Sequence, residues 1–307
     1  MRPDGNQALL DRLASLKERR RAVILAHNYQ RPEVQDAADF TGDSLGLSRE
    51  AARTRAEVIL FCGVHFMAET AAILCPDRTV LVPDPRAGCP MANMITEREL
   101  AQETERLGRP TVVTYVNSTA RIKAMSDWCC TSSNAVKVLS AADPGRPVLF
   151  VPDQSLGAWA AAKSGRTDVS LWRGYCPTHH RILASDVDRA RREHPKALVV
   201  VHPECTAEVI GRADHAASTS GMLEWCAASG AEEFVVGTEV GMLHALSKAN
   251  PGKRFYPASP LADCPNMKLN TLEKMVWSLE DMADVVTVPE PVRSGARRAI
   301  DRMLALA

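Results

Sequence analysis

Three cysteines that are each followed by proline recur at a nearly constant interval along the chain. They are Cys89, Cys176 and Cys264, and the intervals are 176 − 89 = 87 and 264 − 176 = 88 residues. A fixed interval is typical of one structural unit used three times, whereas cysteines that only pack in a core need no fixed interval. Because thiolates are strong metal ligands, the three cysteines predict a metal centre shared by three units.

Two kinds of metal centre agree with this spacing. Zinc usually requires more closely spaced cysteine pairs and a fourth protein ligand, for which His179, three residues after Cys176, is the candidate. A four-iron cluster bound by three cysteines would instead leave one iron open to substrate as a Lewis acid. The spacing by itself leaves both open.

Polar side chains recur at the same interval, at points where apolar runs end. The first of each set are His27, Tyr115 and His202, with 115 − 27 = 88 and 202 − 115 = 87 residues between them. Two residues further along lie Tyr29, Asn117 and Glu204. Ligands of parallel α/β sheets bind beyond the carboxyl ends of the strands. Three units around a pseudo-threefold axis would therefore direct these side chains and the cysteine loops at one central cavity.

A hydroxyl side chain lies 17 residues after each of the first anchors, since 44 − 27, 132 − 115 and 219 − 202 are all 17. These residues are Ser44, Ser132 and Thr219, and each is expected to precede a helix. A hydroxyl in that position is often an N-cap. The free N–H groups and the dipole of a helix start also favour anions, so three such sites would suit a small ligand with several negative groups.

Short apolar runs alternate with helix-like segments along the whole chain, which predicts parallel sheets covered by helices on both faces. The expected strands span 22–26, 58–62, 80–82, 112–115, 148–151, 169–172, 198–201 and 234–236, with one more near Phe255. The expected fold is α/β, with three pseudo-threefold-related three-layer αβα units and short parallel sheets around the central site. The expected units are 1–108 with an N-terminal helix, 109–195, and 196–307 with a C-terminal helix.

Composition limits the class of protein. Lys+Arg and Asp+Glu number 37 each, so the net charge of the 307 residues is zero, which argues against nucleic-acid and membrane-surface partners. No apolar run reaches membrane-spanning length, and the start at Met1–Gly5 lacks the apolar region of a signal peptide. Nine cysteines without an export signal predict a reducing, cytoplasmic location.

The other six cysteines and one histidine–glutamate pair carry weaker signals. The cysteines are expected to pack in cores; they are Cys62, Cys75, Cys129, Cys130, Cys205 and Cys226. His65 and Glu69, four residues apart, have the spacing of half a metal site, but no partner pair is evident and a structural role is expected.

Together these motifs resemble those of the quinolinate synthases, in order and over nearly the whole chain. The motifs are Ile24-Leu25-Ala26-His27-Asn28-Tyr29-Gln30, Gly42-Asp43-Ser44-Leu45, Cys89-Pro90-Met91-Ala92-Asn93, Tyr115-Val116-Asn117-Ser118, Thr131-Ser132-Ser133-Asn134-Ala135, His202-Pro203-Glu204-Cys205, Gly237-Thr238-Glu239 and Asn266-Met267-Lys268. The resemblance implies a triangular arrangement of three α/β units around an oxygen-sensitive four-iron, four-sulfur (4Fe-4S) cluster. It also implies a transferase that condenses iminoaspartate with dihydroxyacetone phosphate, releasing phosphate and water, to give quinolinate for NAD biosynthesis. An aspartate-oxidising enzyme that supplies iminoaspartate is then an expected partner.

The same resemblance assigns roles by position. Cys89, Cys176 and Cys264 correspond to the three cluster ligands, and Tyr29 and Glu204 to the acid–base pair. The substrate-orienting residues are His27, Tyr115, Asn117 and His202, of which His27 and Tyr115 are also expected to take part in catalysis together with the acid–base pair. Ser44, Ser132 and Thr219 correspond to phosphate or carboxylate binders. Cys264 stands alone in its segment, so a regulatory disulfide there is not expected.

Two rival functions remain at this stage. One is another metal-dependent dehydratase or aldolase on the same architecture, which iminoaspartate turnover would distinguish. The other is an iron–sulfur sensor without catalytic activity. The zero net charge and the lack of a DNA-binding helix pair argue against a sensor that acts on DNA.

Overall fold

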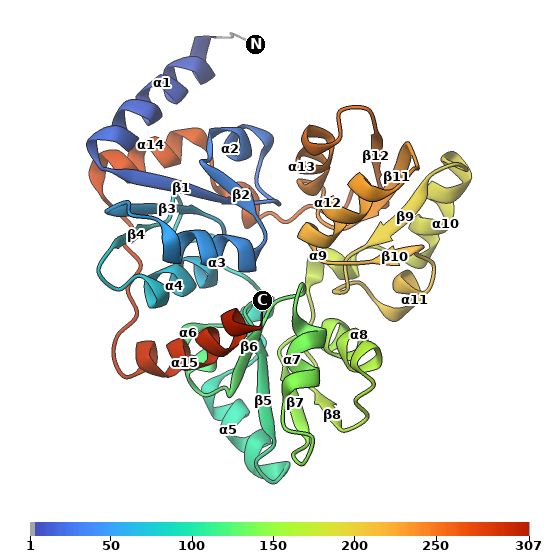
Figure 1. The fold of residues 1–307 in the computed structure, drawn as a ribbon. Helices are drawn as coiled ribbons and strands as arrows, with labels where there is room; N and C mark the ends of the chain where they lie inside the picture. Colours follow the sequence, from blue (N-terminus) through green and yellow to red (C-terminus); the bar gives the residue numbers. More distant parts are fainter. Residues whose placement is uncertain (1–3, 307) are drawn as a thin grey trace.

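The computed structural model describes residues 4–306, so residues 1–3 of the expected first unit and residue 307 of the third lie outside it. Three four-stranded parallel sheets form three lobes of a triangle (Figure 1), which confirms the expected α/β class. The first has the order β2-β1-β3-β4, the second β6-β5-β7-β8 and the third β10-β9-β11-β12. Each sheet thus repeats one topology. The first strand of each unit in the sequence lies between the second strand, which is a short edge strand, and the third strand.

The strands are short and mostly buried. Their bounds are β1 Ala22–His27, β2 Phe40–Gly42, β3 Val58–Cys62, β4 Thr79–Leu81, β5 Thr111–Tyr115, β6 Trp128–Cys130, β7 Val148–Val151, β8 Val169–Leu171, β9 Leu198–Val201, β10 His215–Ala216, β11 Glu233–Gly237 and β12 Arg254–Pro257. In β3, β5 and β7 every residue is buried. Continuous apolar runs of this kind are expected where helices cover both faces of a parallel sheet.

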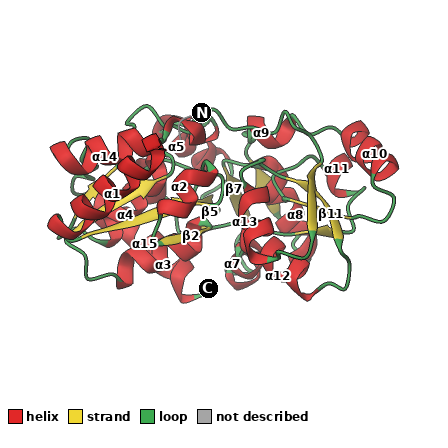
Figure 2. Cartoon of the chain, turned by 90° about the horizontal axis from the view of Figure 1, so that it is seen from above, coloured by secondary structure: helices red, strands yellow, loops and turns green. Residues whose placement is uncertain are grey.

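Helices flank the strands of each unit, and the molecule is wider than it is deep (Figure 2). Their bounds are α1 Asp4–Arg19, α2 Pro32–Ala37, α3 Ser44–Arg53, α4 His65–Leu74, α5 Glu97–Arg106, α6 Ala120–Ala124, α7 Ala135–Ala141, α8 Gln154–Ser164, α9 Pro177–His180, α10 Ala184–Glu193, α11 Ala207–Ile210, α12 Thr219–Ala228, α13 Met242–Ala249, α14 Leu272–Asp281 and α15 Val292–Ala305, with two 3-10 turns at Met91–Asn93 and Met267–Leu269. The start of α5 is a capping box formed by Thr96 and Glu99.

The helix that follows each cysteine loop packs against the next sheet in the ring. Leu100 of α5 packs with Val112 and Leu149 of the second sheet. In the same way α10 packs on the third sheet, and α14 returns to the first sheet beside α1 (Figure 1). The three cysteine loops are therefore the connections between one sheet and the helix on its neighbour, and α14 closes the ring.

Three equivalent aspartates fix the start of the first strand in each unit, and the sequence analysis missed them. Asp39, Asp127 and Asp214 each accept the backbone N–H of the residue 15 positions earlier, at 2.9, 2.9 and 2.7 Å. Their intervals are 127 − 39 = 88 and 214 − 127 = 87 residues. A carboxylate that accepts a backbone N–H satisfies a donor at the end of the sheet, so the repeat extends to the connections as well as to the strands.

The elements that the sequence analysis missed are short. The helices α2, α6 and α11 and the edge strands β2, β6 and β10 recur in each unit, whereas the four-residue helix α9 follows Cys176. These strands have two or three residues and these helices four to six. Segments of that length contain less than two periods of a helical or strand pattern, so periodicity does not detect them.

Asp84 anchors the loop that leads to Cys89. Its side chain is 2% exposed and accepts the Lys274 Nζ of α14 at 2.7 Å and the Arg86 backbone N–H at 2.9 Å. The Arg86 side chain also binds it, at 2.9 Å. The pKa of Asp84 lies well below its usual range, mainly because Arg86 donates hydrogen bonds to the carboxylate and also because Lys274 does. The carboxylate thus ties the loop to the helix that closes the ring.

We expect Asp84→Asn to lower the free energy of unfolding at pH 7 by about 1–3 kcal/mol, because charged hydrogen bonds are lost. Since the folded-state pKa is depressed, the wild-type advantage is complete above the unfolded-state value of about 3.9 and declines as the pH falls below it. Urea unfolding of both proteins between pH 7 and pH 3 measures this. An advantage of the same size at every pH would show that the ionised carboxylate is not its source.

Candidate metal centre and active site

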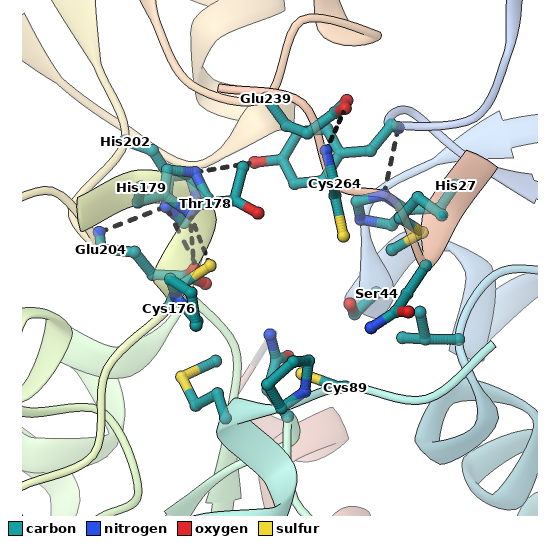
Figure 3. A pocket seen from close by; sticks show the side chains of 18 of the residues that line it. His27, Ser44, Cys89, Cys176, Thr178, His179, His202, Glu204, Glu239 and Cys264 are labelled. Atoms are coloured by element: carbon teal, nitrogen blue, oxygen red, sulfur yellow. Dashed lines mark hydrogen bonds and ion pairs between the residues drawn. The ribbon is translucent and has the colours of Figure 1, made fainter. Parts of the chain in front are cut away.

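The strand ends of the three units enclose one cavity of about 130 Å³, roughly ten times the room that one water needs. Its lining includes every residue that the sequence analysis placed at a site: His27, Tyr29, Ser44, Cys89, Tyr115, Asn117, Ser132, Cys176, His202, Glu204, Thr219 and Cys264. Figure 3 shows side chains from all three units around it. The structure therefore brings all of these residues together, although their roles do not follow from proximity alone.

The sheet register places the three hydroxyl residues at equivalent positions. His27 pairs with Gly42 and Tyr115 with Cys130, and Ser44 and Ser132 each lie two residues after the partner. In the third sheet Val201 pairs with Ala216, which sets His202 beside Ala217, two residues before Thr219.

The expectation that these hydroxyl residues precede their helices is wrong for two of them. Ser44 and Thr219 are the first residues of α3 and α12, and the caps are Asp43 and Ser218. Asp43 accepts the Gly46 N–H at 2.7 Å and Ser218 accepts the Gly221 N–H at 3.2 Å. A side chain one residue earlier reaches the helix N–H groups, which frees the hydroxyls for other contacts.

The three cysteine thiols are free and face the cavity from the three inter-unit connections (Figure 3). Burial raises the pKa of Cys89 to about 12, and burial also raises the pKa of Cys176 and Cys264. A thiolate in such surroundings needs a cationic partner. Three convergent thiols of this kind fit a group that brings its own positive charge, and the 4Fe-4S cluster implied by the resemblance is such a group.

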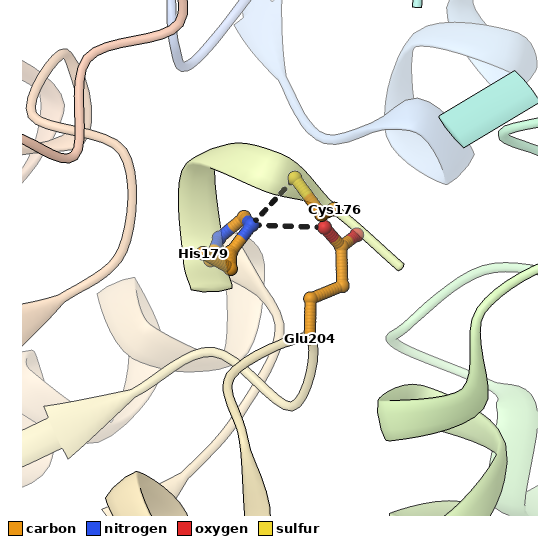
Figure 4. A group of neighbouring side chains, drawn as sticks. All are labelled: Cys176, His179 and Glu204. Atoms are coloured by element: carbon orange, nitrogen blue, oxygen red, sulfur yellow. Dashed lines mark hydrogen bonds and ion pairs between the residues drawn. The ribbon is translucent and has the colours of Figure 1, made fainter. Parts of the chain in front are cut away.

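One of these cysteines also belongs to a tight triad with His179 and Glu204 (Figure 4). His179 Nδ1 lies 3.1 Å from Cys176 Sγ and 2.9 Å from a Glu204 oxygen. The ligand atoms of the three residues are all within 4.8 Å of one another, so the triad could hold a metal ion. His179 is therefore at the site, as its position after Cys176 suggested.

Glu204 is the buried acid of the cavity, with 3% of its surface exposed. The Tyr115 hydroxyl donates to it at 2.5 Å. Burial alone would raise the pKa of Glu204, but the contacts with His179, His202 and Tyr115 outweigh burial and hold the pKa below its usual range. The arrangement thus favours the ionised carboxylate.

The pKa of Tyr29 is shifted in the opposite direction to that of Glu204. Burial and the nearby Glu204 charge raise the pKa of Tyr29 well above its usual value, so the phenol keeps its proton. Its hydroxyl lies 2.7 Å from Thr238 Oγ1, which in turn lies 2.8 Å from His179 Nε2. Sequence reasoning missed Thr238, which appeared only inside the Gly237-Thr238-Glu239 motif.

The two strand-end histidines are neutral at physiological pH. Burial lowers the pKa of His27 to about 4 and that of His202 to about 3. His202 Nε2 lies 3.2 Å from the Ser132 hydroxyl, which joins the third unit to the second. Neutral imidazoles can donate or accept a hydrogen bond without adding charge, which suits residues that orient a polar ligand.

The six other cysteines and Glu69, which carried weaker signals in the sequence, lie in positions that fit a structural role. The six other cysteines are all buried, and Glu69 accepts the Ala120 N–H at the start of α6 at 2.9 Å. Within residues 4–306, no helix is both long and apolar enough to cross a membrane.

Three parallel α/β units closed into a ring around a cavity with three thiols define a class of three-unit α/β proteins with a central, metal-capable site. The model of the family described as quinolinate synthetase A protein matches residues 11–305, so the chain belongs to that family. The chain is 54% identical to the quinolinate synthase of Desulforudis audaxviator, over 99% of this chain and 100% of the relative. It is 55% identical to that of Geobacter metallireducens, over 95% of each, and 53% identical to that of Methanosarcina barkeri, over 97% of each.

Proposed function

We propose that this protein is a quinolinate synthase that condenses iminoaspartate with dihydroxyacetone phosphate, releasing phosphate and water, for NAD biosynthesis. Family membership supports the reaction. The observation that carries the proposal is the convergence of Cys89, Cys176 and Cys264 on the cavity that also holds Glu204 and Tyr29. An acid–base pair beside three thiols suits a reaction that combines proton transfers with loss of water.

Cys89, Cys176 and Cys264 would hold the 4Fe-4S cluster. When bound, the cluster would supply a Lewis acid for the dehydration, because three protein ligands leave one iron open. His179 lies three residues after Cys176, and the residues three positions after Cys89 and Cys264 are Ala92 and Met267. The repeat therefore supplies no equivalent fourth ligand.

The protein groups would divide the remaining work by charge and position. Glu204, an ionised carboxylate, would be the proton acceptor and Tyr29, a protonated phenol, the proton donor. A lowered pKa weakens a base and a raised pKa weakens an acid, so this assignment follows from protonation state and position in the cavity. Tyr115 keeps the Glu204 carboxylate in place through its 2.5 Å hydrogen bond and takes part in catalysis through it. His27, His202 and Asn117 would orient the substrate by hydrogen bonds, with His27 close enough to Tyr29 to act in the same proton transfers; the centroids of their rings are 4.6 Å apart.

Ser44, Ser132 and Thr219 would bind the phosphate or carboxylates of the substrates. Each lies at or just before the start of a helix on the cavity. The free N–H groups there favour anions.

We expect Thr219→Ala to lower kcat/KM by the equivalent of about 1–3 kcal/mol, because it removes one hydrogen bond to an anionic group, while iron content stays unchanged. The matched control is Thr119→Ala, which removes the cap hydroxyl of α6, a helix whose start does not line the cavity. Steady-state kinetics and iron analysis of both variants test this. Unchanged kinetics for Thr219→Ala would reduce this hydroxyl to a structural role.

The function itself is tested by anaerobic purification, iron and sulfide analysis, and an assay of quinolinate formation from iminoaspartate and dihydroxyacetone phosphate. We expect about four irons and four sulfides per chain, and quinolinate as the product. Zinc in place of iron would contradict the cluster. A cluster without quinolinate formation would favour another dehydratase, an aldolase or a sensor.

We also propose how the chain divides into units, where the protein acts and which enzyme supplies its substrate. The folding units would be 1–108, 109–195 and 196–307, although α5, α10 and α14 each pack on the neighbouring sheet. The protein would act in the cytoplasm, without nucleic-acid or membrane partners. An aspartate-oxidising enzyme would supply its iminoaspartate.

A further inference from the structure

Glu239 is a buried carboxyl in the cavity wall for which the proposed reaction has no use. It is 1% exposed. One oxygen, Oε1, accepts the backbone N–H of Cys264 at 3.1 Å and lies 2.8 Å from Lys268 Nζ. The other, Oε2, accepts the Gly241 N–H at 2.8 Å. Glu239 therefore fastens the Cys264 loop, at the cysteine itself and at Lys268, to the segment that follows β11. Figure 3 shows Glu239 beside Cys264.

The sheet register identifies the counterparts of Glu239 in the other two units. Cys62 pairs with Ala26, Val151 with Thr114 and Gly237 with Val201, and each of these partners directly precedes a strand-end anchor of the repeat. The residues two positions further along are therefore equivalent, and they are Val64, Asp153 and Glu239.

Asp153 is also a buried carboxyl beside a cysteine loop. It is fully buried, and its Oδ1 accepts the Leu156 N–H at 2.8 Å, whereas its Oδ2 has no hydrogen-bond partner. Asp153 forms a bridge with Gly174, and the Gln154 N–H donates to the Gly174 carbonyl at 2.9 Å. Burial and the Glu204 charge raise the pKa of Asp153. The Asp153 backbone is thus paired with the loop that carries Cys176, whereas its carboxyl caps α8.

The first unit uses no carboxyl at this position, because Val64 occupies it. Its cysteine loop is attached through backbone instead, since the His65 N–H donates to the Ala87 carbonyl at 2.7 Å. A carboxyl at this position thus holds the cysteine loop of the third unit, whereas in the other two units backbone hydrogen bonds of Gln154 and His65 attach the loop.

We propose that Glu239 is a positioning residue that sets the geometry of Cys264 for metal binding. This inference rests on the proposed cluster ligands. Groups that orient metal ligands typically change metal affinity by about 10–100-fold when removed. The Glu239 carboxyl accepts the backbone N–H of Cys264 itself, so its effect on metal retention should exceed its effect on folding.

The test compares iron release to a ferrous chelator from anaerobically purified, cluster-loaded protein, together with electron paramagnetic resonance spectra of the reduced protein. We expect Glu239→Ala to release iron on the order of tenfold faster than wild type, with altered spectra. Glu239→Gln keeps one acceptor oxygen for the Cys264 N–H but loses the acceptor of the Gly241 N–H, so its release rate should lie between those of wild type and Glu239→Ala.

The matched control is Asp214→Ala, which removes a carboxylate that accepts the Val199 N–H and pairs with Arg191 in the same unit, away from the cysteine loop. It should lower the melting temperature without faster iron release. Equal release rates for Asp214→Ala and Glu239→Ala would overturn the inference, as would a Glu239→Gln variant that releases iron as fast as Glu239→Ala. Wild-type protein without iron and sulfide would instead refute the proposed function.

Discussion

Cys176→Ala is expected to abolish the brown colour of anaerobically purified protein, and Cys89→Ala and Cys264→Ala should do the same. Each of the three connections between the units supplies one thiol to the cavity. If these three thiols hold the proposed cluster, the loss of one leaves it without a complete set of protein ligands. Iron and sulfide analysis and the visible spectrum measure the effect, and the expected loss is nearly complete.

Cys226→Ala is the matched control. Cys226 is buried in the core between α12 and the third sheet and does not line the cavity. Its replacement should cost about 1 kcal/mol or more in stability through a small cavity, with iron content unchanged. Full iron content in Cys176→Ala would defeat the assignment of the ligands.

The same series separates a cluster from a single metal ion. A lone ion held by Cys176, His179 and Glu204 would survive Cys89→Ala and be lost in His179→Ala. A cluster held by the three cysteines predicts the reverse for both variants, since His179 lies in only one of the three units. The pattern over these two variants therefore distinguishes the two kinds of site.

The sequence predicted the cavity well because its residues follow strands that repeat with a fixed interval. Once His27, Tyr115 and His202 are known to follow the same strand in each unit, the parallel topology brings them to one side of the sheet. The equivalence of Ser44, Ser132 and Thr219 then follows from the register of the edge strands.

The missed features depend on contacts between units or on very common residue types. No local pattern shows that α5, α10 and α14 pack on the neighbouring sheet. Asp39, Asp127 and Asp214 recur at the same interval as the cysteines, but aspartate is too common for that recurrence to stand out from the sequence alone. Glu239 and Asp153 become comparable only through the sheet register, because the first unit has Val64 in their place.

The closed ring has a mechanical consequence for the site. Each cysteine loop joins a sheet to a helix on the neighbouring sheet, so a shift of one unit moves a ligand of the proposed cluster. In addition, Lys274 of α14 binds Asp84 in the loop before Cys89. The positions of the three cysteines therefore depend on how the units pack against one another. Metal binding should in turn stabilise the packing of the ring.

Glu204→Gln is expected to lower kcat by about 10²–10⁴-fold while the iron content stays at the wild-type level. The substitution keeps the size of the side chain but removes the carboxylate that would accept protons. It also replaces one acceptor oxygen by an N–H₂ group, which no longer accepts from Tyr115 or His179. Quinolinate formation and iron analysis on the same samples measure both effects.

Glu193→Gln, on the exposed side of α10 and outside the cavity, is the control and should retain full activity. Tyr115→Phe adds a second test, because it leaves the Glu204 carboxylate but removes its 2.5 Å hydrogen bond. A smaller loss of kcat than in Glu204→Gln is expected, since the group that accepts the proton remains. If Glu204→Gln loses its metal together with its activity, Glu204 is a ligand, as the triad with Cys176 and His179 allows. If it keeps full activity, the protons pass through another residue and the assignment of Glu204 as the base is wrong.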